Sequence, residues 1–178
     1  MSVLGLSYAT YVALTAGVLV FVNPAEEKTA GENLPIHKNE WLITAGSNSK
    51  SGSDGPGKDV LISVDYRPDS YLFWKFKPLY AFGFAPDGAV YTSFGIRKDY
   101  RIGPVQITPF FGPALYQRDI GSHWESKELL QFRTGFDIMV PVTGEIKIGG
   151  GFYHISNGQN NDYSADIDVT HATVAVSF

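Results

Sequence analysis

Apolar and polar residues alternate with a period of two along this chain from residue 40 to its end. Successive side chains of a β-strand point to opposite faces, so the alternation predicts strands with one apolar and one polar face. No segment beyond residue 40 shows a convincing helical period. The pattern divides into eight expected strands. They cover residues 40–46, 60–67, 74–84, 89–97, 104–116, 129–140, 145–156 and 167–178.

The two faces of these strands differ in composition. The apolar face carries large aromatic residues and prolines, such as Trp74, Phe76, Pro78 and Tyr80. The other face is rich in Gly, Gln, Thr, Ser and Tyr, and it holds charges of both signs that could pair. These are Asp65, Arg67, Lys75, Lys77, Arg97, Arg133, Asp137 and Lys147.

A polar interior and an apolar, aromatic exterior are typical of membrane β-barrels. Such a barrel closes, because an open sheet edge would leave backbone groups unpaired in hydrocarbon. We therefore expect an all-β protein, an eight-stranded antiparallel transmembrane β-barrel. A soluble barrel with the apolar face turned inward is the alternative.

The connections between the expected strands alternate in length, which predicts an orientation. Residues 47–58, 118–127 and 157–166 are long and polar, whereas 67–70, 98–103 and 142–144 are shorter. The short segment 85–88 departs from this alternation. Long loops of membrane barrels face the outside of the cell and short turns face the periplasm. The odd strands are then expected to ascend toward the cell exterior.

The N-terminal region is expected to lie outside the barrel. Residues 8–22 form an apolar run that is short for a membrane-spanning helix and resembles the core of a secretory signal. We expect residues 1–25 to be a signal peptide, residues 26–39 a periplasmic lead-in and residues 40–178 the barrel. No Lys or Arg precedes the apolar run, so a buried or anchoring helix stays open as an alternative.

Charge and cysteine content exclude several classes of function. The formal net charge is −4 and there is no basic cluster, which argues against nucleic-acid binding. The absence of cysteine excludes a disulfide framework, a thiolate zinc site and a cysteine nucleophile. The sequence shows no group of residues that demands a metal ion or another cofactor.

The segment GFYHISNG places His154 two residues before Ser156, so both side chains share one face of a strand. Continuation by twos from Ile146, Ile148 and Phe152 places this pair on the apolar, outward face. Counting back from Phe178 places Asp168 on the same face of the next strand. Asp168 could orient His154, and His154 could take a proton from Ser156, which would attack an ester carbonyl.

Two alternatives stay open at this point. Asp162 and Asp166 are rival acids in the same region. His, Ser and Asp residues also occur at the rim of a barrel without any chemical role.

The motif H-x-S-N-G in a penultimate strand, followed by a loop and a last strand ending in Phe178, resembles the PagL family of outer-membrane lipid A 3-O-deacylases. The resemblance implies a Ser-His-acid triad on the outer surface of the barrel. His154 and Ser156 match the motif directly, and Asp168 stands where the family pattern has Glu. Asn157 and Gly158 also match, whereas Ser164 stands where the pattern has an Asn that helps form the oxyanion hole.

The resemblance implies hydrolysis of the ester at position 3 of lipid A, without a cofactor. The implied partners are lipid A or lipopolysaccharide as substrate and the outer membrane, with the site toward the outer leaflet; a homodimer stays open. Acyl chains could lie along outward aromatic residues such as Phe111, Phe132, Phe136 and Phe152. His37, His123 and His171 are expected to be structural, with His171 facing the interior.

Two other classes of function stay open. One is a non-enzymatic structural or adhesive barrel that binds through residues 47–58 and 118–127. The other is a soluble lipocalin-like binder.

Overall fold

The computed structural model describes residues 38–50, 60–86, 88–117, 130–157 and 167–178. The expected signal peptide, most of the lead-in and most of the long loops lie outside these residues. The described residues form nine strand segments. They are β1 (Glu40–Lys50), β2 (Val60–Arg67), β3 (Lys77–Phe84), β4 (Val90–Arg97), β5 (Tyr100–Ile102), β6 (Val105–Gln117), β7 (Leu130–Pro141), β8 (Ile146–Ser156) and β9 (Ile167–Ser177).

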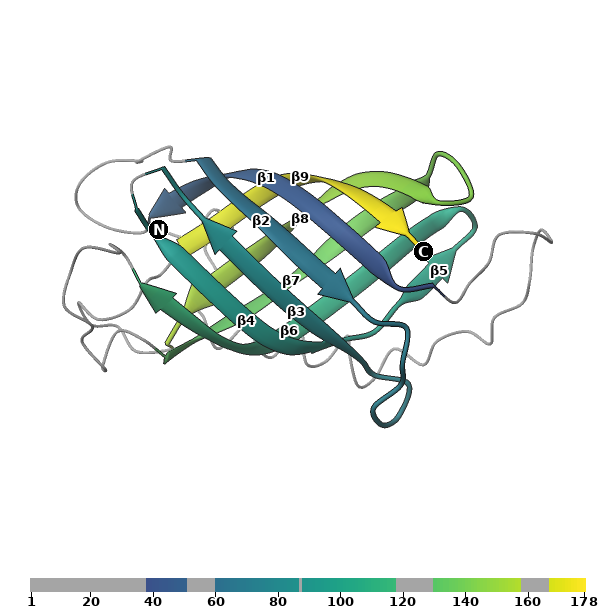
Figure 1. The fold of residues 1–178 in the computed structure, drawn as a ribbon, viewed down its shortest axis with the longest axis horizontal. Coiled ribbons are helices and arrows are strands. Elements are labelled where there is room, and N and C mark those ends of the chain that lie inside the picture. The colour runs from purple at the N-terminus through teal and green to yellow at the C-terminus, as the bar shows by residue number, and fades with distance from the viewer. Residues whose placement is uncertain (1–37, 51–59, 87, 118–129, 158–166) are drawn as a thin grey trace.

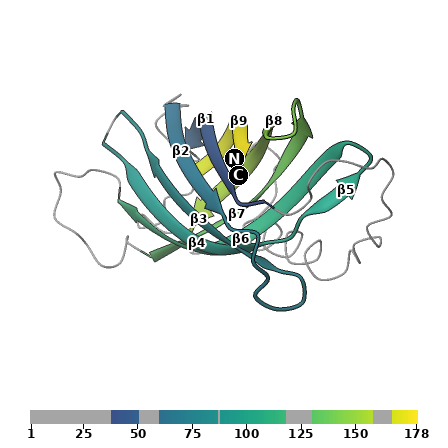
Figure 2. The ribbon, with the colours of Figure 1, turned by 45° about the vertical axis from the view of Figure 1, so that its right-hand side comes forward.

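These segments close into a barrel of eight antiparallel strands (Figures 1 and 2). β4 and β5 both pair with β6 and are separated by two residues, so they are two parts of one strand. β1 pairs with both β2 and β9, which brings the first and last strands together. The expected eight-stranded antiparallel barrel is confirmed.

Within the described ranges, the structure contains no helix of the length and apolarity needed to cross a membrane.

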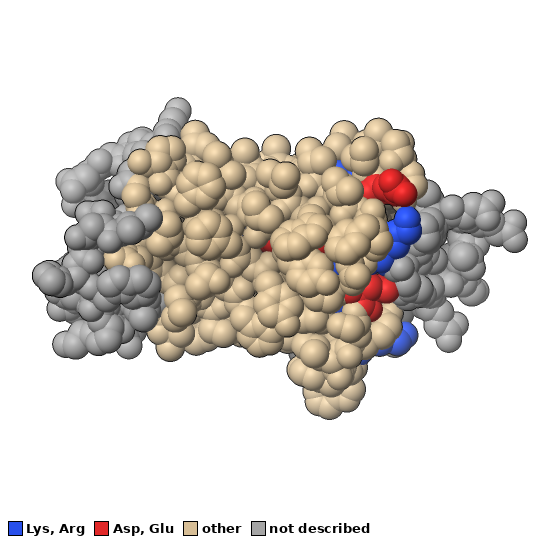
Figure 3. Space-filling view, in the orientation of Figure 1, with Lys and Arg blue, Asp and Glu red and all other residues tan. Residues whose placement is uncertain are grey.

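The exterior of the barrel is apolar. The outward side of every wall carries large, exposed hydrophobic side chains, such as Ile43 on β1, Phe82 on β3, Ile138 on β7 and Val174 on β9. In Figure 3 the Lys, Arg, Asp and Glu atoms gather at the right-hand end, and nearly all of the remaining described surface lacks them. A closed barrel with such a belt suits hydrocarbon rather than water. The chain is therefore a transmembrane β-barrel, and the alternative of a soluble lipocalin-like binder is wrong.

The two ends of the barrel differ. We call the end where β1 begins and β9 stops the C-terminal end, which carries the C mark in Figure 1, and the other the far end. Toward the C-terminal end the interior is built from ion pairs between neighbouring and facing strands. They join Arg67 to Asp137, Arg133 to Asp65 (3.1 Å), Lys77 to Asp69 (2.6 Å) and Lys147 to Glu40.

Toward the far end the interior combines an apolar cluster with a few buried polar side chains, among them Ser63 and Gln131. Leu61, Tyr91, Ile155 and Val169 belong to one buried cluster there. The interior is therefore most polar at the C-terminal end and in the middle of the barrel, and it is more apolar at the far end than expected. A filled apolar core at that end closes the lumen with side chains, as in other small barrels.

Three predictions about the strands and their connections are corrected by the structure. The first strand extends to Lys50 rather than ending at residue 46, so the start of the expected loop 47–58 belongs to β1. The third strand begins at Lys77 rather than at Trp74, because residues 71–76 form a turn in which Trp74 and Lys75 have positive φ angles of 45° and 64°. Lys75 is consequently exposed and does not face the interior. Residues 98–103 are not simply a turn, because β5 lies within them and pairs with β6.

Candidate functional site

The predicted triad residues lie at the far end of two neighbouring strands. His154 and Ser156 are near the end of β8, and Asp168 is the second residue of β9. The antiparallel register of β8 and β9 places His154 directly opposite Asp168. Nδ1 of His154 and Oδ1 of Asp168 are 2.8 Å apart, which is a short, well-formed hydrogen bond.

The side chains of this group point away from the lumen. Their neighbours in sequence, Tyr153 and Ile155 on β8 and Val169 on β9, belong to the interior apolar cluster. Because successive side chains of a strand alternate, His154, Ser156 and Asp168 lie on the outward surface. The structure thus brings all three residues to the lipid-facing side of one strand pair.

The three side chains are nevertheless buried, each with 3% of its surface exposed. Polar groups withdrawn from water are destabilising unless they are hydrogen-bonded, and the bond between His154 and Asp168 offsets part of that cost.

The hydrogen bond to Asp168 bears on which nitrogen of the His154 ring could act as a base. If Asp168 accepts a hydrogen bond from Nδ1–H, the ring carries its lone pair on Nε2. Nε2 is then the nitrogen that could take the proton of a serine hydroxyl, which is the division of roles in serine hydrolases.

A residue that the sequence reasoning missed lies beside this group. Thr134 on β7 is directly opposite His154 on β8, faces outward and is 1% exposed. Its Oγ1 has no hydrogen-bond partner among the described residues. Parity along β7 places Thr134 outward, but only the register between β7 and β8 identifies it as the neighbour of His154.

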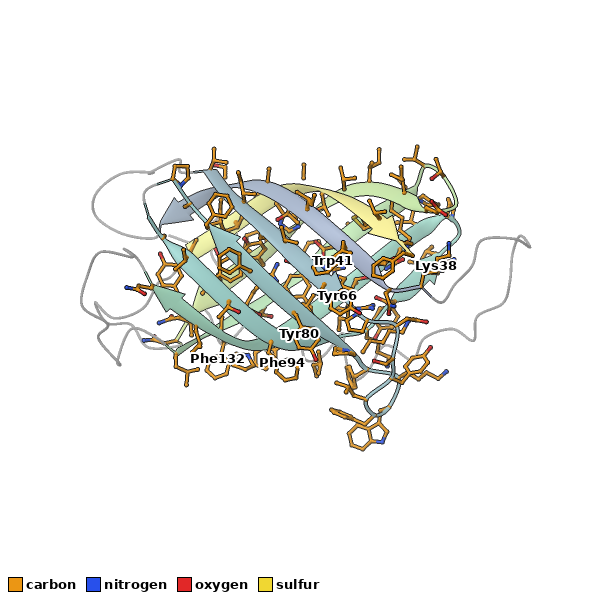
Figure 4. The ribbon with its side chains drawn as sticks, in the orientation of Figure 1. Lys38, Trp41, Tyr66, Tyr80, Phe94 and Phe132 are labelled. Atoms are coloured by element: carbon orange, nitrogen blue, oxygen red, sulfur yellow. The ribbon has the colours of Figure 1, made fainter. Side chains whose placement is uncertain are left out.

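Aromatic side chains flank the group on the same surface. Phe132 on β7 is directly opposite Ser156, and its ring stacks on that of Phe111 on β6, with ring centroids 5.8 Å apart and planes 4° apart. Phe136 and Phe152 face each other across β7 and β8. Figure 4 shows Phe132 near the far end of the barrel. These rings form an apolar border around the polar cluster.

Most of the other predicted site residues lie outside the part of the chain that the structure describes. Asn157 follows Ser156 directly and is half-buried, but Gly158, Ser164 and the rival acids Asp162 and Asp166 lie outside the described residues. Among the described residues, no group of three or more His, Asp or Glu residues could hold a metal ion.

His171 has the structural position that was predicted for it. It faces the interior, and its Nε2 lies 2.7 Å from Oδ1 of Asp137. His37 and His123 lie outside the described residues.

The fold places the chain in the class of small transmembrane β-barrels. Solved structures with a similar fold belong to the same class. A de novo designed transmembrane β-barrel matches with a TM-score of 0.57 and 8% identity, over 79% of this chain and 95% of the design. The outer membrane enzyme PagL matches with a TM-score of 0.54 and 11% identity, over 78% of this chain and 99% of PagL.

Neisserial surface protein A matches with a TM-score of 0.50 and 13% identity, over 79% of this chain and 96% of its own. No protein-family model and no curated protein matches the sequence. At these identities the likeness concerns the fold alone, which an enzyme, a surface protein and a designed barrel share.

Proposed function

We propose that this protein is an outer-membrane ester hydrolase that removes the 3-O-linked acyl chain of lipid A. The observation that carries the proposal is the hydrogen bond between His154 and Asp168 on the outward surface, with Ser156 two residues along the same strand. A base, its orienting carboxylate and a hydroxyl thus share one surface, and the sequence around them resembles the PagL motif.

The proposed reaction follows the chemistry of serine esterases. Ser156 Oγ attacks the ester carbonyl while His154 Nε2 takes its proton, and Asp168 stabilises the resulting imidazolium. The tetrahedral intermediate collapses when the sugar 3-oxygen leaves with the proton from His154. Water then attacks the acyl-serine with His154 again as base, which releases a 3-hydroxy fatty acid and regenerates Ser156.

Stabilisation of the intermediate requires donors near the carbonyl oxygen. Backbone N–H groups of Asn157 and Gly158 and the side chain of Ser164 are the proposed donors, following the resemblance. The Thr134 hydroxyl is a further polar group on the same surface.

The position of the group on the barrel fits a lipid substrate. Ester-linked chains of a membrane lipid reach the outward wall by lateral diffusion, so no aqueous cleft is needed. The flanking rings of Phe111, Phe132, Phe136 and Phe152 offer apolar surface for acyl chains. With the C-terminal end in the periplasm, the far end lies in the outer leaflet, where lipopolysaccharide resides.

A non-enzymatic structural or adhesive barrel is the second candidate. The observation that favours it is the near-complete burial of Ser156, His154 and Asp168, since a hydrogen-bonded polar cluster at a strand end is also compatible with a purely structural role.

Mass spectrometry of lipid A separates the two candidates. We expect cells that produce the wild-type barrel to contain lipid A that lacks one 3-hydroxyacyl chain, and cells that produce Ser156→Ala to contain intact lipid A. Ser47→Ala is the matched control, because Ser47 is also outward on a neighbouring strand but lies opposite Thr170 rather than beside a histidine. Intact lipid A in wild-type cells that contain folded barrel would overturn the enzymatic proposal.

A further inference from the structure

The connection between β2 and β3 exposes an unusual concentration of apolar side chains. Tyr71, Leu72, Phe73 and Trp74 are 53%, 49%, 51% and 83% exposed. We call residues 71–75 the aromatic loop. It lies at the C-terminal end of the barrel, opposite to the end that carries His154 and Ser156, so it plays no part in the proposed catalytic site.

The aromatic loop has a defined conformation. The Leu72 N–H donates to Phe76 O and the Phe76 N–H donates to Phe73 O, both at 2.8 Å, which closes a tight turn. Trp74 and Lys75 at its tip have φ angles of 45° and 64°, which are unfavourable for residues other than glycine. The backbone therefore adopts a strained turn that presents Trp74 to the surroundings.

Contacts at its base hold the aromatic loop against the barrel. Phe76 is buried, and its ring lies 5.5 Å from that of Phe73 and 5.5 Å from Nζ of Lys98. Nζ of Lys77 lies 5.1 Å from the ring centroid of Tyr71. These contacts hold the base of the loop against the barrel and so set the direction in which the loop projects.

That direction is sideways. In Figures 1 and 2 the segment between β2 and β3 projects away from the barrel wall, near the end that carries the C mark, rather than along the barrel axis. It therefore extends over the zone where the apolar exterior meets the charged rim seen in Figure 3.

An aromatic row crosses the barrel wall on the two strands that the aromatic loop joins and on their neighbours. Trp41, Tyr66, Tyr80 and Phe94 are direct neighbours across β1, β2, β3 and β4. Their ring centroids are 4.8, 6.2 and 5.4 Å apart in that order, and Figure 4 shows the four side chains in a line. Rows of Trp and Tyr mark the level of the lipid headgroups in membrane barrels.

We propose that the aromatic loop is a membrane anchor that inserts into the phospholipid leaflet at the C-terminal end of the barrel. Trp74, Phe73 and Leu72 would enter the boundary between headgroups and acyl chains, where Trp is favoured. Lys75 at the tip adds a positive charge that suits the phosphate of an anionic phospholipid. The exposed side chains of the aromatic loop and the outward side chains of β2 and β3, the strands it joins, are apolar or aromatic, which favours lipid over a protein as the occupant.

Fluorescence of Trp74 in vesicles tests the proposal. In a variant with Trp41→Phe and Trp124→Phe, Trp74 is the one remaining tryptophan. The protein is reconstituted into vesicles of phosphatidylethanolamine with a minority of phosphatidylglycerol, and folding is checked by heat-modifiable migration on a gel. We expect blue-shifted emission, strong quenching by lipids brominated near the headgroup, weaker quenching by lipids brominated deep in the chain, and weak quenching by aqueous iodide.

A matched variant retains Trp41 alone, through Trp74→Phe and Trp124→Phe, and reports on the barrel wall itself. It is expected to be quenched by brominated lipids because Trp41 lies on the outward surface of β1. If Trp74 instead emits as a water-exposed indole, is quenched by iodide and ignores brominated lipids, the loop is directed into the periplasm and the anchor proposal fails.

Lys75→Glu tests the contribution of charge. With Lys75, we expect the quenching of Trp74 by headgroup-brominated lipid to increase with the phosphatidylglycerol content of the vesicle. The Glu variant is expected to reverse this dependence. Equal dependence in the two proteins would overturn the proposed role of Lys75 in binding anionic lipid.

Discussion

At the scale of single residues, the contact between His154 and Asp168 is the feature on which the proposed chemistry depends. The two side chains meet because they occupy opposite positions of one strand pair, and Ser156 shares their surface through simple alternation. Spacing in the sequence predicted this arrangement, since His154, Ser156 and Asp168 were each placed by counting in twos. Thr134 could not be found in this way, because its position depends on the register of a strand pair.

Asp168→Asn is expected to slow deacylation while leaving the barrel folded. The amide can present its N–H groups to His154 and favour the tautomer in which Nε2 no longer accepts a proton, and in a comparable triad such a change lowers kcat by about 10⁴-fold. The rate of fatty-acid release from lipopolysaccharide by the purified barrel measures the effect. Asp168→Glu keeps the carboxylate and is expected to retain more activity. Equal rates for wild type and Asp168→Asn would contradict the role of Asp168.

Thr134→Val is expected to leave the free energy of unfolding unchanged or raise it by about 1 kcal/mol, because valine removes a buried hydroxyl that lacks a described partner. The same change is expected to slow deacylation if the hydroxyl contacts substrate. Urea unfolding in lipid vesicles and the rate of fatty-acid release measure the two effects separately.

Thr108→Val is the matched control for this measurement. Thr108 Oγ1 donates to Asp99 at 3.1 Å and accepts from Gln106 at 3.0 Å, so its loss should cost about 1–3 kcal/mol. An equal loss of stability in both variants would show that the Thr134 hydroxyl is bonded in the folded protein.

At the scale of strands, alternation predicted most of the fold. β2 begins and ends at the predicted residues, and β6 to β9 agree to within one residue at each end. The third strand was misplaced because Trp74 and Phe76, in the preceding turn, continue the apolar alternation of Pro78 and Tyr80 on β3. Positive φ angles at Trp74 and Lys75 are set by the contacts of the turn, and neither residue type signals them in a sequence.

The glycines of β8 have a packing role that alternation alone did not indicate. Gly151 lies between Asp137 on β7 and His171 on β9, and all three positions face inward. The missing side chain lets His171 reach across β8 to Asp137. A Cβ at Gly151 would lie 2.2 Å from Phe136 O and 2.8 Å from Asp137 Oδ1, both far too close.

Gly151→Ala is therefore expected to lower the free energy of unfolding by about 1–3 kcal/mol, the usual cost of overpacking. Gly144→Ala is the control, because no atom lies within 4 Å of a Cβ built there. Urea unfolding of the barrel in vesicles compares the two. If the Gly151→Ala barrel were as stable as the Gly144→Ala barrel, β7, β8 and β9 would accommodate the added methyl group without cost, and the predicted overpacking would be wrong.

At the scale of the whole molecule, the barrel separates three environments. The middle and C-terminal end of the lumen hold ion pairs, the far end holds an apolar core, and the exterior is an apolar belt with an aromatic row. The proposed reactive group lies on the belt at the far end, and the aromatic loop lies at the other. The two proposals together place ester chemistry and membrane anchoring in opposite leaflets.

The proposed chemistry requires that His154 activates the Ser156 hydroxyl at a lipid-facing surface. A lipophilic fluorophosphonate, which bonds covalently to activated serine hydroxyls, tests this most directly when peptide mass spectrometry locates the label on the folded barrel. We expect labelling of Ser156 in the wild type and its loss in His154→Ala. An unlabelled Ser156 in the folded wild type, or labelling that persists without His154, would contradict the proposed chemistry.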